Sequence, residues 1–354
     1  MTEPEPPSGP AGLSGPAGAS GPAGASRRPG PAGPGGPLPA LRPLALARGT
    51  VDRSTERRTD PAWFEARWAD PGTRVLVIDD GQALVRLGDA DAELVLLPVA
   101  QAPEGPRYLL GVDDAGRAYF SVTAPLPAAD EAAPGQLKPA ADGAESGQPK
   151  PAGLRQVGAL LGDRDAGLLT HAVALANWHA THTHCPRCGA LTNLVTGGHS
   201  RICPVDGSEH FPRTDPAVIT LVTDDGDRAL LARNRGWPER RVSILAGFVE
   251  PGESAEQAVV REVAEETGIT VGEVRYLGSQ PWPMPASLML GFRARAHGAQ
   301  PIRVDEEEIA EAHWFSRDGL RASMAAGEVR LPPPVSIAYR IVESWYGDEL
   351  PAQW

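Results

Sequence analysis

The sequence GFVEPGESAEQAVVREVAEETGI, residues 247–269, decides the fold of the C-terminal part of the chain. It follows the pattern Gly-x5-Glu-x7-Arg-Glu-aliphatic-x-Glu-Glu-x-Gly-aliphatic at every fixed position. Ser254 and Gln257 form a capping box, which predicts a helix that starts near Ala255. Gly268 supplies the left-handed residue that commonly ends a helix. We therefore expect one helix over most of this stretch.

Three glutamates of this helix have a spacing that is typical of a metal site. Glu262, Glu265 and Glu266 stand at positions i, i+3 and i+4, on one face of the helix. Their carboxylates repel each other, and a hard divalent cation that prefers oxygen ligands, Mg²⁺ or Mn²⁺, would relieve this repulsion. A solvated acidic face is the alternative, but the flanking glycines and Arg261 in register favour the metal site. The residues expected to anchor the other side of the helix on a sheet are Val260, Val263 and Ala264.

The pattern resembles the signature of the Nudix hydrolase superfamily. The resemblance implies an α/β/α sandwich with a mixed sheet, on which the glutamate helix packs. It implies that Glu262 and Glu266 are direct metal ligands and that Glu265 is a ligand or a candidate base. Arg261 would orient carboxylates, and the carbonyl of Ala246 would complete a metal site. The implied reaction is hydrolysis, by a metal-activated water, of a nucleoside diphosphate linked to another group.

A second motif lies downstream, at residues 279–287, and reads SQPWPMPAS. It resembles the SQPWPFPxS signature of NADH pyrophosphatases within the superfamily, with Met284 where the family usually has Phe. The three prolines stiffen the segment, so that Trp282 can offer a face to a flat heterocycle and Gln280 can pair with a polar edge. A proline-rich surface loop is the alternative. The substrate-binding residues predicted here are Gln280, Pro281, Trp282, Pro283, Met284, Pro285, Ala286 and Ser287.

The same resemblance implies further site residues outside the two motifs. Phe211 and Phe248 match aromatic positions that sandwich a substrate ring, although the family commonly has Tyr at the position of Phe211. Arg155 matches a substrate-contacting arginine, and Ala338 a residue that lines the pocket. Glu308 matches another metal-binding carboxylate, with Glu307 as the alternative register. Ordinary packing or a solvated charge run is the alternative for each of these residues.

The only three cysteines form a possible metal site upstream of the helix. Cys185-Pro-Arg-Cys188 is followed by fourteen residues and then by Cys203-Pro-Val-Asp206, a spacing typical of zinc ribbons. NADH pyrophosphatases are similar but have four cysteines, whereas here the fourth position is Asp206. We expect one structural zinc ion with Asp206 as the fourth ligand, then His210 and His184 as alternatives. A ribbon that has lost its metal is the alternative.

Composition limits the kind of protein and its surroundings. A net charge of −12 over 354 residues argues against a surface that binds nucleic acid extensively through its phosphates. Clustered cysteines favour a metal site in a reducing compartment over disulfides. No run of 18 apolar residues is present, so no membrane span is expected. The N-terminus lacks the features of a secretory signal, and we expect a cytoplasmic protein.

The fold class predicted is α/β (α+β), with several regions in sequence. Gly-Pro-Ala repeats in residues 1–40 lack large apolar side chains and predict disorder. Turn residues between apolar runs predict hairpins at 74–87 and 108–122. The predicted regions are a disordered Gly/Pro/Ala-rich tail (1–50), a β-rich N-terminal domain (51–126), a flexible linker (127–152), a helical connector (153–182), a zinc ribbon (183–213), the Nudix domain (214–346) and a C-terminal tail (347–354).

These features together predict an enzyme that cleaves the diphosphate bond of NAD(H), giving nicotinamide mononucleotide and AMP. Removal of the NAD cap from RNA 5′ ends by the same site is an alternative, as is another nucleoside diphosphate substrate such as ADP-ribose. A dinucleotide sensor without activity is disfavoured because all the glutamates are present. The family resemblance also implies a homodimer.

Overall fold

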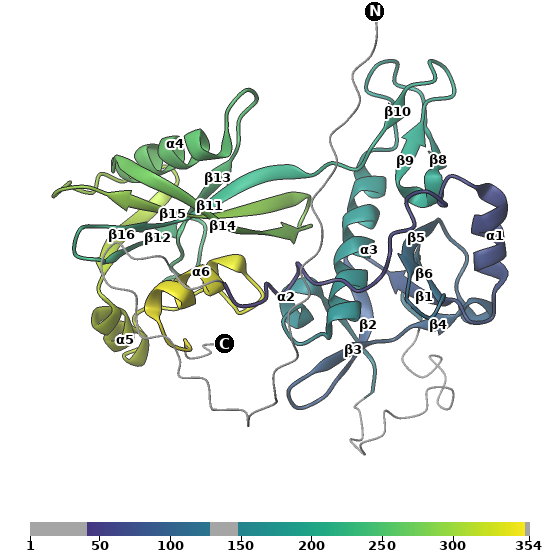
Figure 1. The fold of residues 1–354 in the computed structure, drawn as a ribbon, viewed down its shortest axis with the longest axis horizontal. Helices are drawn as coiled ribbons and strands as arrows, with labels where there is room; N and C mark the ends of the chain where they lie inside the picture. Colours follow the sequence, from purple (N-terminus) through teal and green to yellow (C-terminus); the bar gives the residue numbers. More distant parts are fainter. Residues whose placement is uncertain (1–40, 128–147, 351–354) are drawn as a thin grey trace, which may run out of the picture. The chain divides into compact units, whose positions relative to one another are not determined.

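The computed structural model describes residues 41–127 and 148–350 (Figure 1). Residues 1–40 of the predicted tail, most of the predicted linker and residues 351–354 lie outside the described residues. The described chain begins before residue 50, where the tail was expected to end. Ala45 and Leu46 are only 5% and 2% exposed. The boundary moves because residues 41–48, LRPLALAR, contain apolar side chains that can be buried.

The N-terminal domain contains two small sheets. One has the strand order β4-β1-β6-β5 and the other the order β3-β2-β7. The strands are β1 (Arg74–Ile78), β2 (Gln82–Leu87), β3 (Ala92–Leu94), β4 (Leu97–Pro98), β5 (Arg107–Val112), β6 (Ala118–Thr123) and β7 (Lys150–Gly153).

One of the two predicted hairpins is confirmed, and the other is wrong. β5 and β6 pair antiparallel as expected. The turn between β1 and β2 also forms, with positive φ at Asp80 and Gly81, but β1 pairs with β4 and β6 while β2 pairs with β3 and β7. β1 is buried on both faces from Val75 to Ile78, so it becomes an inner strand of its own sheet instead of one arm of a hairpin.

Helices cover these sheets. Helix α1 (Pro61–Ala69) packs Phe64 and Trp68 edge-on against Phe120 of β6. The short helix α2 (Leu154–Val157) and the long helix α3 (Asp163–Thr181) lie in the region predicted as a helical connector. Most of α3 is buried, which makes it the central helix of this domain. A 3-10 turn, η1 (Val99–Gln101), follows β4.

The ribbon is a three-stranded sheet that follows α3. Its order is β10-β9-β8, with antiparallel pairing throughout. The strands are β8 (Asn193–Val195), β9 (Ser200–Ile202) and β10 (Glu209–His210), and a 3-10 turn, η2 (Thr196–Gly198), joins the first two.

The C-terminal domain is a mixed sheet between two layers of helices, as predicted (Figure 1). Along β11, Val218 and Val222 belong to the core under helix α4, whereas Ile219 and Leu221 belong to the core under helices α5 and α6. This alternation is the two-residue period of a strand that is covered on both faces. The strand order is β14-β15-β11-β12-β16, β11 and β15 are parallel, and β13 pairs with β11. The elements are β11 (Asp215–Thr223), β12 (Ala229–Asn234), β13 (Leu245–Phe248), α4 (Ala255–Thr267), β14 (Val271–Trp282), β15 (Ser287–Ala296), β16 (Ile309–Phe315), α5 (Arg317–Ala325) and α6 (Ile337–Tyr346).

Residues 41–48, here called the N-terminal strap, contact both domains. Leu41 and Leu44 pack against the core under α5 and α6, while Ala45 and Leu46 belong to the core around α3. The backbone N–H of Leu46 donates to Gln280 Oε1 at 3.2 Å. Gln280 in turn donates from Nε2 to the carbonyl of Val335 at 3.0 Å. One buried amide therefore connects segments that are far apart in the sequence.

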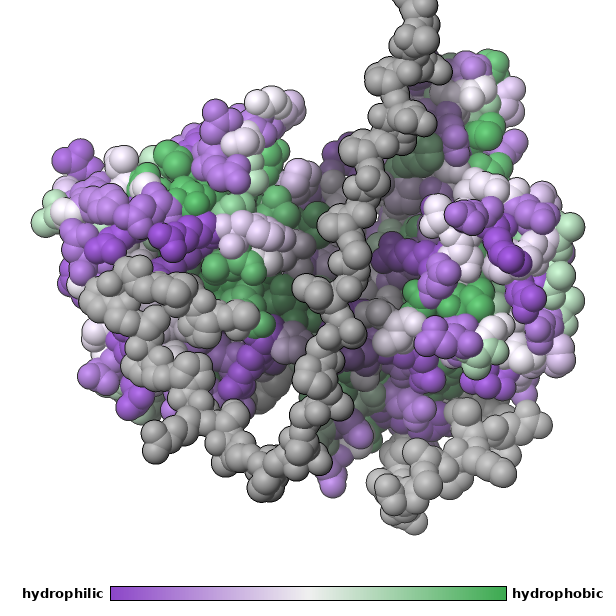
Figure 2. Space-filling view, viewed as in Figure 1, coloured by the Kyte–Doolittle hydropathy of each residue, from purple (hydrophilic) through white to green (hydrophobic). Residues whose placement is uncertain are grey.

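The surface mixes polar and apolar side chains. On the face drawn in Figure 2, hydrophilic residues alternate with smaller hydrophobic patches. No helix within residues 41–127 and 148–350 is long and apolar enough to cross a membrane.

Candidate functional site

The glutamate helix α4 forms as its capping residues predict. Ser254 and Gln257 exchange two hydrogen bonds, Gln257 N–H to Ser254 Oγ at 3.2 Å and Ser254 N–H to Gln257 Oε1 at 2.9 Å. Gly268 ends the helix with φ 68°. These local contacts set where α4 begins and ends.

The buried face of α4 differs from the expected one. Val263 is fully buried as predicted, but Val260 is 37% exposed and Ala264 is also exposed. Ala258 and Val259 take the buried positions instead. Val259 and Val263 are one turn apart, and Glu266 lies three residues after Val263. The orientation of α4 that buries Val259 and Val263 therefore also buries Glu266.

Glu266 is a buried carboxyl group with no partner for one of its oxygens. The residue is 6% exposed, and Oε2 has no hydrogen-bond partner among the described residues. Burial, together with the charges of Glu262 and Glu308, raises the pKa of Glu266 to about 8. Such a group is stable as a carboxylate only if a cation balances it.

Glu262 and Glu308 complete this acidic group. Glu262 lies directly against Gly247 in β13, where any side chain would collide with its carboxylate. Burial also raises the pKa of Glu262, and the charge of Glu308 contributes. Ala246 precedes that glycine and pairs with Ile219 of β11. We call Glu262, Glu265, Glu266 and Glu308 the glutamate cluster. Its oxygen-rich composition fits a hard divalent cation.

Arg261 holds several carboxylates of this region. Its guanidinium donates to both oxygens of Glu253 (2.9 and 2.8 Å), to Glu262 Oε1 (2.8 Å), to Glu265 Oε2 (3.0 Å) and to the carbonyl of Phe248 (2.9 Å). Hydrogen bonding to these glutamates raises the pKa of Arg261. The arginine thus orients acidic side chains and leaves Glu266 without a positive partner.

The proline-rich motif is the end of one strand and the start of the next, and not a free loop. Ser279–Trp282 belongs to β14, and Ser287 begins β15, where it pairs with Trp282. Only residues 283–286 form the turn. The side-chain amide of Asn177 on α3 donates to the carbonyl of Pro283 at 2.8 Å. The alternative of a free surface loop is wrong, because the long β14–β15 pairing extends into the motif.

A cavity of about 880 Å³ brings several predicted substrate residues together. Met284, Pro285 and Ala286 line it from one side and Arg155 from another. The Arg155 guanidinium also lies 5.1 Å from the centre of the Trp282 ring, within the range of a cation–π contact. The members of the glutamate cluster do not line this cavity.

Four other predicted substrate residues lie elsewhere. Gln280 is 0% exposed and its amide is bonded to backbone groups, while Ala338 is 1% exposed in the core under α6. Neither side chain reaches the surface in this structure. Phe211 and Phe248 are 64% and 58% exposed, so both rings are available for contact.

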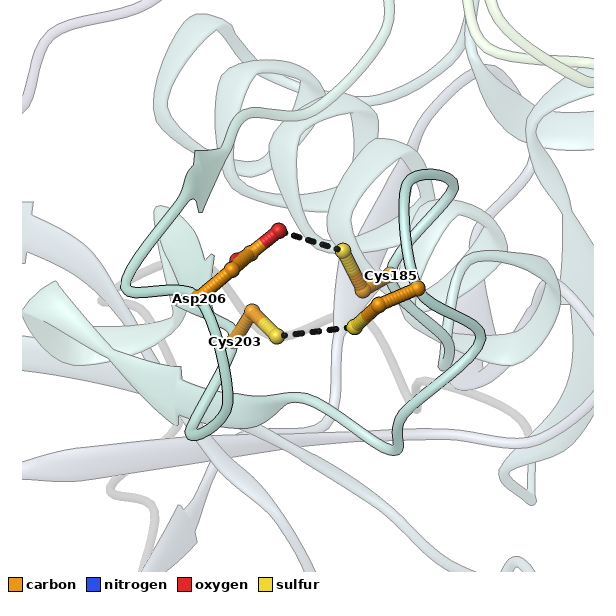
Figure 3. Close-up of side chains that lie close together, drawn as sticks. Cys185, Cys203 and Asp206 are labelled. Atoms are coloured by element: carbon orange, nitrogen blue, oxygen red, sulfur yellow. Dashed lines mark hydrogen bonds between the residues drawn. The ribbon is translucent and has the colours of Figure 1, made fainter.

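The ribbon brings the four predicted zinc ligands together. One ligand atom from each of Cys185, Cys188, Cys203 and Asp206 lies within 4.8 Å of the others, and Figure 3 shows Cys185, Cys203 and Asp206 pointing toward one another. The Cys188 and Cys203 sulfurs are 3.5 Å apart, and the Cys185 sulfur is 3.7 Å from Asp206 Oδ2. We call these residues the cysteine–aspartate quartet. Ser208 binds the other Asp206 oxygen through both its N–H and its hydroxyl group, which leaves Oδ2 directed at the sulfurs.

Comparison with known proteins divides the chain as the structure does, into an N-terminal domain, a ribbon and a C-terminal domain. Family models match for an NADH pyrophosphatase-like rudimentary NUDIX domain at residues 72–178, an NADH pyrophosphatase zinc ribbon domain at 180–211 and a NUDIX domain at 213–333. "NAD-capped RNA hydrolase NudC" of Mycobacterium tuberculosis (strain H37Rv) is 41% identical over 309 residues, which is 85% of this chain and 94% of that protein. The chain belongs to the NADH pyrophosphatase group of Nudix hydrolases. "NAD-capped RNA hydrolase NUDT12" of Macaca fascicularis is 32% identical over 83% of this chain and 71% of that protein.

Within this Nudix hydrolase, three residues that were not predicted as site residues support the candidate sites. Glu253 binds Arg261, Asn177 holds the turn of the proline-rich motif, and Ser208 orients Asp206. Glu253 could have been found, because it is the first fixed glutamate of the Nudix pattern. No local signal identifies Asn177, since its partner lies 106 residues away.

Proposed function

We propose that this Nudix hydrolase cleaves the diphosphate bond of NAD(H) to give nicotinamide mononucleotide and AMP. The observation that carries the proposal is the buried carboxyl group of Glu266, which feels the charges of Glu262 and Glu308 and has one oxygen without a partner among the described residues. A site that only senses dinucleotides needs no such concentration of carboxylates.

In this proposal the glutamate cluster holds Mg²⁺ or Mn²⁺. Glu262, Glu266, Glu308 and the carbonyl of Ala246 are the ligands. When bound, the ions supply charge neutralisation on the diphosphate oxygens and lower the pKa of a water molecule. Arg261 keeps the carboxylates in place through its hydrogen bonds. Glu265, which is exposed at the end of that network, and Glu308 are the candidates for the general base.

The proposed substrate contacts lie on the proline-rich motif and on exposed aromatic rings. Trp282, which Arg155 contacts, offers a ring face for stacking, and Met284, Pro285 and Ala286 line the neighbouring cavity. Phe211 and Phe248 are exposed aromatic residues that are available to a substrate ring or to a second subunit. We propose a homodimer in which these rings lie near the subunit contact.

A second substrate, the NAD cap of an RNA 5′ end, is favoured by the names of the relatives. Both the mycobacterial and the macaque relative are called NAD-capped RNA hydrolases. A cap presents the same diphosphate and the same nicotinamide end as free NAD. The glutamate cluster and Trp282 can therefore act on it without an extended RNA-binding surface.

The cysteine–aspartate quartet fits one structural zinc ion. Its four donors match the number of ligands in closed zinc sites, and Ser208 supplies the outer hydrogen bonds that such ligands usually have. All three thiols are free. A reducing compartment keeps such thiols available for metal binding, and we propose a cytoplasmic location.

The deciding experiment is a panel of substrates assayed with Mg²⁺ and with Mn²⁺. It compares NADH, NAD, NADPH, ADP-ribose, diadenosine diphosphate and an RNA with a 5′ NAD cap. We expect NADH and NAD to give AMP and a nicotinamide mononucleotide at the highest kcat/KM. Faster turnover of ADP-ribose or of diadenosine diphosphate than of either dinucleotide would refute the proposed specificity.

A further inference from the structure

A second cavity, of about 980 Å³, lies between the N-terminal domain and the ribbon. Its walls come from the start of α1, from β5, from the C-terminal part of α3 and from the ribbon strands β8 and β9. These elements lie side by side in Figure 1. No member of the glutamate cluster or of the proline-rich motif lines it.

The charge of this cavity is opposite to that of the chain. The chain carries a net charge of −12, yet the described residues that line the cavity include three arginines and no aspartate or glutamate. Arg107 is neutralised by two hydrogen bonds to Glu65, at 3.0 and 3.2 Å. The other two arginines, Arg58 and Arg201, have no carboxylate within salt-bridge distance among the described residues.

Arg58 and Arg201 instead contact neutral groups. Arg58 Nη1 lies 2.6 Å from Nδ1 of His199, and its Nε is buried without a hydrogen-bond partner among the described residues. Arg201 contacts Nδ1 of His179 at 3.0 Å and donates to the carbonyl and the hydroxyl group of Thr192. Two guanidinium groups thus line one cavity, and no carboxylate in the described part of the chain pairs with either.

The neighbouring histidines add no charge to the cavity near pH 7. Burial lowers the pKa of His179 and of His199 to about 4, so both rings are neutral near pH 7. Their second ring nitrogens contact backbone carbonyls, Gly198 O at 2.8 Å for His179 and Leu109 O at 2.9 Å for His199. The rings therefore hold the arginines in position, and the positive charge at the cavity is that of the arginines.

The rest of the wall is mainly apolar. Phe64, Leu194 and Val195 line the cavity, and Tyr108, which is stacked on His179 at 4.5 Å, forms another part. Small-molecule pockets of about 300–1,000 Å³ with apolar walls and a few fixed polar groups are common in proteins. Arginine forks match the oxygens of a phosphate group, and aromatic and aliphatic walls accept a flat ring.

We propose that this cavity is a second ligand site, which binds a nucleotide through its phosphate at Arg58 and Arg201 and through its base at the apolar wall. The site is separate from the hydrolytic one, and its existence does not depend on the substrate proposed above. Its ligand is either a free mononucleotide or the monophosphorylated end of an RNA, since both present the same group.

The test is a calorimetric titration of the zinc-loaded full chain without Mg²⁺ or Mn²⁺, with AMP as the probe. We expect one site whose affinity for AMP falls at least about tenfold in Arg58→Gln and in Arg201→Gln, because each loses a charged hydrogen-bond donor. Arg275→Gln is the matched control, since it removes one positive charge from the exposed surface of β14. NADH hydrolysis should be unchanged in all three variants.

A third variant keeps the test valid if the arginine variants do not fold. Leu194→Glu adds a negative charge to the wall at a residue that is 36% exposed and leaves the arginine contacts intact. It should also weaken AMP binding at least about tenfold. AMP binding that is absent in the wild-type protein, or that is equal in the wild type and Leu194→Glu, would overturn the proposal.

Two further probes identify the ligand class. Inorganic phosphate should compete with AMP if the arginines bind the phosphate group, and failure to compete would contradict that assignment. An uncapped, 5′-monophosphorylated oligoribonucleotide that binds more tightly than AMP would make the ligand an RNA end. Tighter binding of AMP would make it a free nucleotide.

Discussion

The glutamate cluster and the cysteine–aspartate quartet both gather anionic groups, but they balance them in different ways. In the glutamate cluster, Arg261 contacts Glu262 and Glu265, while Glu266 stays buried with one oxygen unbonded. In the quartet, all four ligand atoms lie within 4.8 Å, and Ser208 already binds the second oxygen of Asp206.

The difference corresponds to two kinds of metal site: one whose ion would exchange ligands during a reaction, and one whose ion would stay bound. Oxygen ligands, such as those of the proposed catalytic site, suit hard ions that keep open positions for water and substrate. Three sulfurs and one oxygen, as in the proposed zinc site, form a closed set of the kind that binds zinc tightly and contributes to folding.

The largest effect is expected from Glu266→Gln in the glutamate cluster. The substitution keeps the size of the side chain but removes a charge that holds the metal in the proposed site. The kcat for NADH with Mg²⁺ should fall by at least about 100-fold, because metal-assisted charge stabilisation is lost. Glu256→Gln, on the exposed first turn of the same helix, is the matched control. A near-normal kcat in Glu266→Gln would remove this residue from the proposed metal site.

Elemental analysis examines the quartet directly. Freshly purified protein should contain about one zinc per chain, because three clustered thiolates make a high-affinity site. Asp206→Ala should reduce zinc retention more than His210→Ala, since Ser208 directs Asp206 toward the sulfurs. The reverse order would make His210 the fourth ligand, and protein without zinc would contradict the proposed site.

Trp282→Ala should affect substrate recognition more than chemistry. The loss of roughly 1–3 kcal/mol of stacking would raise the KM for NADH roughly 5- to 150-fold, with a smaller change for a diphosphate that lacks the second base. Trp237→Ala is the control, because Trp237 has a similar contact with an arginine, 4.9 Å from Arg241, outside the motif. Equal losses for all substrates would mean that Trp282 supports the fold and does not bind the ring.

The smallest effect concerns stability without metal. The pKa of Glu266 is about 8 in the folded chain and 4.5 in the reference state. The unfolded chain therefore loses this proton first, and metal-free stability should fall as pH rises from about 4.5 to about 8. At pH 8, Glu266→Gln should melt at least about 2 °C above the metal-free wild type. Calorimetric scans at pH 5 and pH 8 would detect this, and an equal shift at both pH values would exclude ionisation as the cause.

Contacts between residues close in sequence explain what the sequence predicted well. The capping box at Ser254 and Gly268 determine where α4 begins and ends. The two turns that carry the cysteines are closed by hydrogen bonds between residues a few positions apart. Glu262 and Glu266 share a face because of helical spacing alone. These features need no knowledge of the remaining chain.

Long-range pairing explains what the sequence did not predict. Strands β1 and β2 belong to different sheets because β1 pairs with β4 and β6, and these partners come later in the chain than the predicted hairpin. Gln280 seemed suited to bind substrate, but its amide bonds to Leu46 and Val335, which are 234 and 55 residues away. The arginine-lined cavity likewise depends on the packing of α1 against the ribbon, which no spacing rule describes.

The N-terminal strap has a consequence for how the protein is made. Residues 41–48 leave the ribosome early, yet their partners Gln280 and Glu343 are among the later residues to be synthesised. Leu41 and Leu44 pack against the core under α5 and α6 and wait for these late elements, whereas Ala45 and Leu46 pack in the core around α3, which is synthesised earlier. A fragment that contains only the C-terminal domain would leave Gln280 Oε1 buried without its donor, and we expect such a fragment to be less stable than the same domain in the full chain.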